Sequence, residues 1–220
     1  MPAFVDIEFM RIVVPLLGRG ALITIQLTLL AIVFGLLIGL AVALIKLSPF
    51  RILRWFGGLY TWVLRGVPLL VQLYVLYYGL AQARILELDP FTAAVTGLSM
   101  CAGAYIAEII RGGIQSIDHG QMEAALSLGM NPAAAMRRII LPQALRRILP
   151  PLGNEFITSL KDTSLVSVIT MVELMRTGVL LDVTYFRSLE IYLAVAAFYL
   201  LMTTFFVYTI DALEKKFKII

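Results

Sequence analysis

The chain has 220 residues, of which 60% are hydrophobic and 15% are charged, and its formal net charge is +4. Soluble domains carry about 25% charged residues, so this composition excludes an ordinary soluble protein and indicates a membrane protein. The basic balance is typical of Lys and Arg held on the cytoplasmic side of a bilayer, and we expect no nucleic-acid partner. With one cysteine, Cys101, and one histidine, His119, we expect no metal site.

Apolar stretches, taken in chain order, predict the membrane spans, each of which needs about 20 residues. They cover residues 20–45, 66–83, 90–107, 152–172 and 191–210. The fourth stretch is irregular because it contains three charged residues. We therefore predict an all-α membrane protein with about five transmembrane helices, forming a single domain over residues 1–220.

The distribution of positive charge predicts the orientation of these spans. With the N-terminus outside, twelve Lys and Arg residues fall on the cytoplasmic side, including Lys215, Lys216 and Lys218 in the tail. Five fall outside: Arg11, Arg19, Arg84, Arg176 and Arg187. This asymmetry favours an outer N-terminus and a cytoplasmic C-terminus, and it makes residues 118–150 a cytoplasmic loop.

That loop contains signals for two short helices around a tight turn. Residues 121–128 are good helix formers, and Gly129 follows them as a residue suited to a left-handed helix end. Asn131 then precedes Pro132, which is typical of an N-cap followed by proline at the first helical position.

The second short helix is predicted over residues 133–141, stopped or bent at Pro142. Met136, Ile139 and Ile140 give it an apolar stripe. A compact pair of short helices suits docking into a groove of a soluble partner. From the residues alone, an amphipathic segment lying on the bilayer explains the stretch about equally well. A DNA-reading helix pair is a weaker alternative, because the helices are short.

The same stretch resembles the EAA signature of permease subunits in ATP-driven, binding-protein-dependent importers. The matching residues are Glu123, Ala124, Ala125, Gly129, Ile139, Leu141 and Pro142. Three further segments are similar to polar amino acid permeases of the histidine, arginine and glutamine type: RGVPLLVQ (65–72), AYIAEIIRGG (104–113) and KDTSL (161–165). The resemblance covers most of the chain.

The resemblance implies a function and a set of partners. The short helices, with Asn131, Pro132 and Arg137 beside the signature residues, would be coupling helices seated in a cleft of a separate ABC ATPase subunit. That subunit would bind ATP and Mg²⁺. An extracytoplasmic binding protein would deliver a polar amino acid to two permease chains, most simply a homodimer, in the bacterial plasma membrane. The chain itself has no phosphate-binding loop, so we expect no cofactor, no catalytic residue and no enzyme activity in it.

Charged residues within spans mark the candidate substrate pathway, because such charges usually face a cavity or a partner. Glu155 and Asp162 are seven residues apart, on one face of a continuous helix, and Lys161 adjoins them. Asp162, Thr163 and Ser164 are N-cap residue types, which predicts a helix that restarts there and aims its positive end at a substrate carboxylate. Alternatively, these side chains pair with one another and only cap a helix.

Four other polar residues have two explanations each. Gln72 lines the pathway or bonds to a neighbouring helix. Glu108 and Arg111 form a helix pair at the interface or contact the ATPase. Arg65 is expected to anchor the cytoplasmic end of the second span rather than bind substrate.

The predicted function is thus the permease subunit of an amino acid importer. The acidic residues favour a basic substrate such as arginine, lysine or histidine, although glutamine stays open. An ion-gradient-driven transporter or channel is the alternative, and a membrane scaffold or receptor subunit is a third. The absence of inverted halves disfavours the ion-driven carrier.

Overall fold

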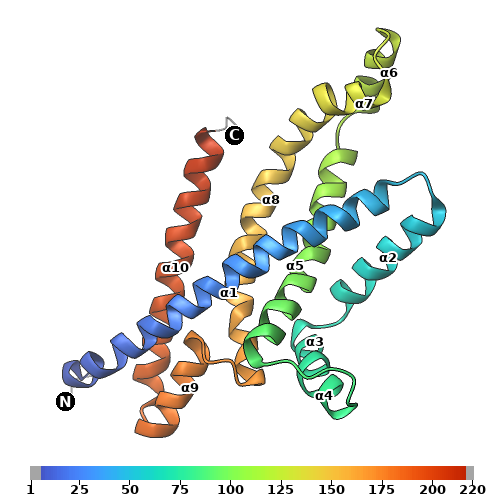
Figure 1. The fold of residues 1–220 in the computed structure, drawn as a ribbon. Helices are drawn as coiled ribbons and strands as arrows, with labels where there is room; N and C mark the ends of the chain where they lie inside the picture. The colour runs from blue at the N-terminus through green and yellow to red at the C-terminus, as the bar shows by residue number, and fades with distance from the viewer. Residues whose placement is uncertain (1–5, 217–220) are drawn as a thin grey trace.

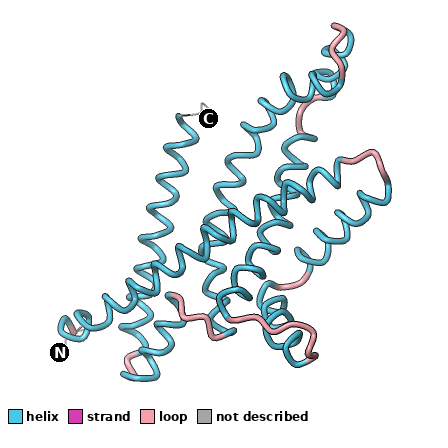
Figure 2. The backbone as a smooth tube through the Cα atoms, in the orientation of Figure 1, coloured by secondary structure: helices cyan, strands magenta, loops and turns pink. Residues whose placement is uncertain are grey.

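The computed structural model describes residues 6–216, and these residues form helices joined by short turns, without a strand (Figures 1 and 2). Three helices are long and apolar enough to cross a membrane: α1 (Ile7–Leu47), α5 (Pro90–Gln115) and α10 (Ser188–Lys216). Two bent helix pairs bring the number to five if each pair is one span. This agrees with the predicted all-α fold and its five spans.

The first predicted span is part of a much longer helix. α1 has 41 residues and begins after Asp6, whose Oδ1 accepts hydrogen bonds from the backbone N–H groups of Glu8 and Phe9. At 1.5 Å per residue it is roughly 60 Å long, twice the hydrocarbon thickness of a bilayer. It therefore lies obliquely across the other helices (Figure 1). Arg11 and Arg19, expected outside the span, are residues of this helix.

The second span begins at a break, and within the predicted stretch at residues 66–83 the segment from Leu69 to Gln82 is continuously helical. α2 (Arg51–Gly66) occupies what was expected to be a loop, and α3 (Leu69–Tyr74) starts after Val67 and Pro68. A π-helical turn (Val75–Gly79) and α4 (Leu80–Gln82) complete the span. The two parts meet at 101°. Proline lacks a backbone N–H and disfavours the helical region for its predecessor, and Val67 is indeed extended (φ −101°, ψ 131°).

α5 lies at the centre of the fold and continues eight residues beyond its predicted end at residue 107. It begins with Asp89 as N-cap and Pro90 at the first position. Hydrogen bonding from Thr92 lowers the pKa of the Asp89 carboxyl below its usual value. Glu108 and Arg111 therefore lie within the helix and form the expected helix pair.

α1 and α5 pack closely because small residues line their contact. A Cβ added to Gly39 would lie 2.6 Å from Ile106 Cγ2 and 3.0 Å from the carbonyl oxygen of Gly103, so only glycine fits there. Small residues at such contacts let helix backbones approach within a membrane. This pair is the scaffold against which the other spans are placed.

The fourth span is longer than the predicted stretch at residues 152–172, and it too is broken. α8 (Leu141–Asp162) passes into a 3-10 helix (Thr163–Ile169), and α9 (Leu174–Tyr185) follows at an angle of 48°. α10 then returns across the fold (Figure 1).

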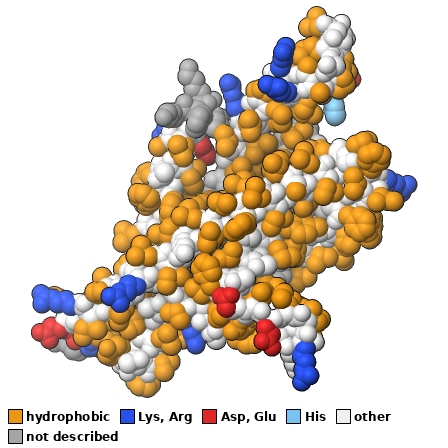
Figure 3. Space-filling model, viewed as in Figure 1, with side chains coloured by type: hydrophobic (Ala, Val, Ile, Leu, Met, Phe, Trp, Pro, Cys, Tyr) orange, Lys and Arg blue, Asp and Glu red, His pale blue; other side chains and the backbone are white. Residues whose placement is uncertain are grey.

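The chain has two polar ends on either side of an apolar middle. α6 (His119–Ser127) and α7 (Pro132–Ala135) lie at one end with the C-terminal end of α10, while the start of α1, α4 and α9 lie at the other (Figure 1). The space-filling view shows hydrophobic side chains over the middle and charged side chains near both ends (Figure 3). Of the three tail lysines, Lys218 lies outside the described residues.

Candidate substrate cavity and coupling tip

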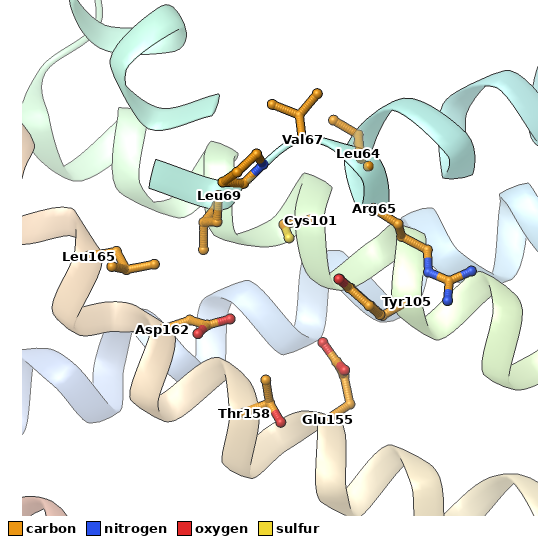
Figure 4. A pocket seen from close by; sticks show the side chains of 12 residues that line it. Leu64, Arg65, Val67, Leu69, Cys101, Tyr105, Glu155, Thr158, Asp162 and Leu165 are labelled. Atoms are coloured by element: carbon orange, nitrogen blue, oxygen red, sulfur yellow. The ribbon is translucent and has the colours of Figure 1, made fainter. Parts of the chain in front are cut away.

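A cavity of about 540 Å³ lies where the broken second span meets α5 and α8 (Figure 4). We call it the substrate cavity. Its walls come from the α2–α3 break, from one face of α5 and from one face of α8. The lining residues are Leu64, Arg65, Gly66, Val67, Pro68, Leu69, Cys101, Tyr105, Glu155, Thr158, Asp162 and Leu165.

One wall of the cavity is acidic. Glu155, Thr158 and Asp162 follow one another along a single face of α8, as a seven-residue separation on a continuous helix predicts. Figure 4 shows both carboxylates pointing into the space below α5. The structure thus confirms the prediction that these two acids lie on one face of a continuous helix.

The opposite wall carries a positive charge, which was not predicted at this place from the sequence. Arg65, the penultimate residue of α2, lies with its guanidinium carbon 5.2 Å from the centroid of the Tyr105 ring. In the described part of the chain no carboxylate lies within 4.0 Å of it. Arg65 was expected to anchor the end of the span, and the break at Pro68 also brings this residue to the wall of the cavity.

Gln72 holds the break in shape. Its Nε2 donates to the carbonyl oxygens of Leu64 and Val67, both at 2.8 Å. These carbonyls lie at the end of α2 and in the turn, where a helix leaves acceptors without partners. Of the two explanations for Gln72, the structure shows a bond to a neighbouring helix, and the residue does not line the substrate cavity.

The predicted helix restart at residues 162–164 is wrong. Thr163 Oγ1 donates to the Leu160 carbonyl at 2.7 Å, and Ser164 Oγ donates to the Lys161 carbonyl at 2.8 Å. Both hydroxyls bond back into the preceding turn, so the chain stays helical and tightens to 3-10 geometry. Lys161 is exposed, and in residues 6–216 it makes no ion pair with Glu155 or Asp162.

The actual restart is at Leu174, and it is capped by Glu173, which sequence reasoning missed. Glu173 is fully buried. Its carboxylate accepts from the backbone N–H groups of Met175 and Arg176, both at 2.8 Å, and from the hydroxyls of Thr24 (3.3 Å) and Tyr199 (3.1 Å). It thus ties α9 to α1 and α10. In the sequence, this cap is indicated by a single acidic residue within an apolar segment.

At the other end of the molecule, α6 and α7 form a tip around a glycine turn, which we call the coupling tip. Gly129 has φ +82°, the left-handed conformation that the sequence predicted. Asn131 Oδ1 accepts from the Ala134 N–H at 2.8 Å, and Pro132 is the first residue of α7. These three features agree with the sequence-based description.

Of the two alternatives for Pro142, a stop or a bend, the structure excludes the stop. After α7 the chain forms a π-helical turn, Met136–Ile140, and continues directly into α8. In that turn the Leu141 N–H bonds to the Met136 carbonyl, five residues back. A local shift to this wider pattern absorbs the hydrogen bond that a proline cannot donate. The tip is thereby joined without a break to the helix that carries Glu155 and Asp162.

The coupling tip is firmly mounted yet exposes an apolar turn. Buried Ile117, Ile140, Ala144 and Ile148 form its base. Leu128, by contrast, is 84% exposed at the turn. Glu123, Ala124, Arg137 and Pro142 are also exposed, Ile139 and Leu141 are half-buried, and Ala125 is buried. An exposed leucine on a rigid mount suits a site for a protein partner.

A multi-span helical fold with a cavity lined by charged residues and a projecting tip is compatible with a membrane transport protein. Comparison with known proteins gives the family. Residues 9–219 match the family model for the binding-protein-dependent transport system inner membrane component. The chain belongs to this family and is an amino acid ABC importer permease of the inner membrane.

Individual relatives agree with this assignment. The chain is 43% identical over 208 residues to the glutamine transport system permease protein GlnP of Escherichia coli K12, covering 94% of this chain and 95% of the relative. It is 36% identical over 205 residues to the arginine transport system permease protein ArtQ of Bacillus subtilis 168, covering 93% and 94%. A crystal structure of an amino acid ABC transporter with histidines superposes with a TM-score of 0.92 at 43% identity, covering 97% of this chain and all of that one. The family assignment replaces the ion-driven carrier and the receptor subunit as explanations.

Proposed function

We propose that the substrate cavity binds a polar amino acid, with a preference for basic ones, and releases it to the cytoplasm during ATP-driven import. The observation that carries this proposal is the opposition of charges across one cavity. Arg65 lines the space from α2, beside Tyr105, and Glu155 and Asp162 line it from α8. A free amino acid presents a carboxylate and an ammonium group, which are the complements of these side chains.

The balance of charge supports the basic preference. Two carboxylates and one guanidinium leave the cavity with an excess negative charge once an amino acid's own two charges are matched. A second cation on the substrate side chain, as in arginine, would compensate it. Glutamine, named for one relative, satisfies the same zwitterion pattern and would bind more weakly. In this proposal Gln72 shapes the wall, while Lys161, Thr163 and Ser164 support the end of α8.

We also propose that the coupling tip docks in a separate ABC ATPase that holds ATP and Mg²⁺. The contact would use Glu123, Ala124 and the exposed turn around Gly129. The continuous path from the tip through the π-helical turn into α8 supports this, because it links the docking surface to the acidic wall. An extracytoplasmic binding protein and a second copy of this chain complete the assembly.

The single cysteine tests the cavity directly. Cys101 lines the substrate cavity and is the only cysteine of the chain. The residue is only 8% exposed, so its labelling is slow and is compared over long incubations. In membranes containing the assembled transporter, arginine should slow the reaction of Cys101 with N-ethylmaleimide, measured by mass spectrometry of this chain. Glutamine should do so at higher concentration. Glu155→Gln should raise the arginine concentration needed by roughly 10- to 100-fold, since a hydrogen bond to a charged group is lost.

The matched control is Glu87→Gln, which changes an exposed acid in the turn before α5. It should leave protection unchanged. If neither amino acid slows the labelling of Cys101 in a transporter that still imports, the substrate cavity is not the binding site.

The coupling tip is tested at Gly129. Gly129→Val forces a β-branched residue into the left-handed region, whereas Gly129→Asn places there a residue that tolerates it. A tagged chain should retain its ATPase during purification with Asn and lose most of it with Val. Equal retention in both variants would contradict docking through this turn.

A further inference from the structure

A second hollow adjoins the substrate cavity on the side of the coupling tip. It has a volume of about 430 Å³ and lies between the C-terminal end of α1, the second half of α2 and the end of α5. We call it the cytoplasmic groove. Its polar lining consists of Lys46, Thr61, Arg65 and Glu108.

The groove and the substrate cavity share a wall. Arg65 and Gly66 line both spaces. On α5, Tyr105 lines the cavity and Glu108, one helical turn further toward the coupling tip, lines the groove. A ligand that leaves the cavity past Arg65 on this side therefore enters the groove.

The charges in the groove are opposite in sign to those of the cavity. Lys46 Nζ donates to Thr61 Oγ1 at 2.7 Å and also contacts Glu108. Arg111 donates to the same Glu108 carboxylate through Nε at 2.9 Å and Nη2 at 2.6 Å. One carboxylate is thus shared by two cations, and Arg65 adds a third cation at the edge. The cluster keeps a net positive charge.

Lys46 is held in position for a ligand by these contacts. Its side chain is only 15% exposed, and the Thr61 hydroxyl and Glu108 fix its ammonium group. A preorganised, partly desolvated cation binds an anion more strongly than a mobile one on the surface. Its location at the groove wall makes it the natural partner of a carboxylate.

We propose that the cytoplasmic groove is a second, transient binding site for the carboxylate of the amino acid on its way out, formed by Lys46 and Arg65. This rests on the proposed function of the substrate cavity. Arg65 holds the carboxylate in the cavity and shares it with Lys46 during exit. The net positive groove repels the substrate's cationic groups, so binding there is weak and release is fast. Conduction through successive weak sites follows the same logic in channels.

A cysteine in the groove tests this proposal. A side chain at Gly58, which lines the groove, meets nothing within 4 Å. In the assembled transporter carrying Cys101→Ser and Gly58→Cys, N-ethylmaleimide is applied from the cytoplasmic side of inside-out vesicles. Arginine should slow labelling at position 58. Lys46→Gln should raise the arginine concentration that protects position 58 by about tenfold. Lys46→Arg should show protection at the same arginine concentration as native Lys46.

Arg51→Gln is the matched control, because Arg51 is an exposed cation at the start of α2 that does not line the groove. It should not change protection at position 58. Agmatine, which is arginine without the carboxylate, provides a test that needs no change at Lys46. It should fail to protect position 58.

The outcomes separate this inference from the proposed function. The groove is supported if Lys46→Gln leaves the protection of native Cys101 by arginine intact but removes the protection of position 58. Protection at Cys101 without any at position 58 overturns the groove and leaves the cavity intact. Equal effects of Lys46→Gln and Arg51→Gln, or protection of position 58 by agmatine as strong as by arginine, also overturn it. Loss of protection at both positions removes the proposed function itself.

Discussion

The second and fourth spans are both broken, but the two breaks differ in sequence and in surroundings. Between α2 and α3 the chain turns by 101° at Val67 and Pro68, which are exposed beside the substrate cavity. Between the 3-10 helix and α9 it turns by 48° without a proline or glycine, through Thr170 at φ +64°. The first break is held by the local hydrogen bonds of Gln72, and the second by the buried carboxylate of Glu173.

The difference indicates different tasks. The first break is exposed at Val67 and Pro68 and forms one wall of the cavity in which we propose that the substrate binds. The second joins α1, α9 and α10 at the outer end of the fold, where Leu17, Leu174 and Ile191 pack in one core cluster. We therefore expect changes at the first break to affect substrate binding more than stability, and changes at the second to do the reverse.

The largest effect is expected at Glu173. Glu173→Ala removes an acceptor from two backbone N–H groups and two hydroxyls in a buried site, at a cost of about 3 kcal/mol. For a chain of this size this corresponds to a fall in melting temperature of roughly 6–12 °C, measured on the purified complex.

Two further variants sharpen this prediction. Glu173→Gln keeps one acceptor oxygen, so its melting temperature should lie between those of the native protein and Glu173→Ala. Glu87→Ala, at an exposed acid, should leave the melting temperature unchanged. A fall with Glu173→Ala no larger than with Glu87→Ala would show that the second break is held by packing alone.

A smaller loss of stability but a clear loss of binding is expected at Gln72. Gln72→Leu keeps the side chain's volume and removes two hydrogen bonds, at a cost of about 1–2 kcal/mol. Because the bonded carbonyls lie at the cavity wall, arginine protection of Cys101 should weaken clearly. The melting temperature should fall less than with Glu173→Ala. Gln82→Leu, at the exposed end of α4, is the control. Unchanged protection would mean that Pro68 alone shapes the wall.

The smallest effect, of opposite sign, is expected at Thr170. A β-branched residue in the left-handed region is strained, so Thr170→Gly should stabilise the protein by about 1 kcal/mol. The melting temperature should rise by roughly 2–4 °C. Thr184→Gly, within α9, should instead lower it, because glycine weakens a helix interior. A fall with Thr170→Gly would show that the threonine contributes more by contact than it costs in strain.

Several features of the site were readable from the sequence because their causes are local. The turn at Gly129, the cap at Asn131 and the helical start at Pro132 follow from what those residues do to their own backbone. The shared face of Glu155 and Asp162 follows from helical periodicity. The span count follows from runs of apolar residues, although the actual helices extend past the runs. In α5, for example, Glu108 pairs with Lys46 of α1 and with Arg111.

Other features could not be read, because they depend on contacts between distant residues. Thr163 and Ser164 had the composition of a helix start, but their hydroxyls bond backwards and the helix continues. Glu173 caps the real restart only because Thr24 and Tyr199 reach it from α1 and α10. Pro142 was expected to stop or bend a helix, and a π-helical turn accommodates it while the helix continues.

The sequence by itself determined that this chain crosses a membrane several times, carries a glycine-centred tip and resembles a binding-protein-dependent permease. Each of these depends on composition, periodicity or residues close together in the chain. Only the tertiary structure decided that Arg65 lines the same cavity as Glu155 and Asp162, and that Lys46 meets Thr61 and Glu108 beside it. Those residues come from different helices, and their distances are set by the close packing of α1 on α5 and by the bend at Pro68.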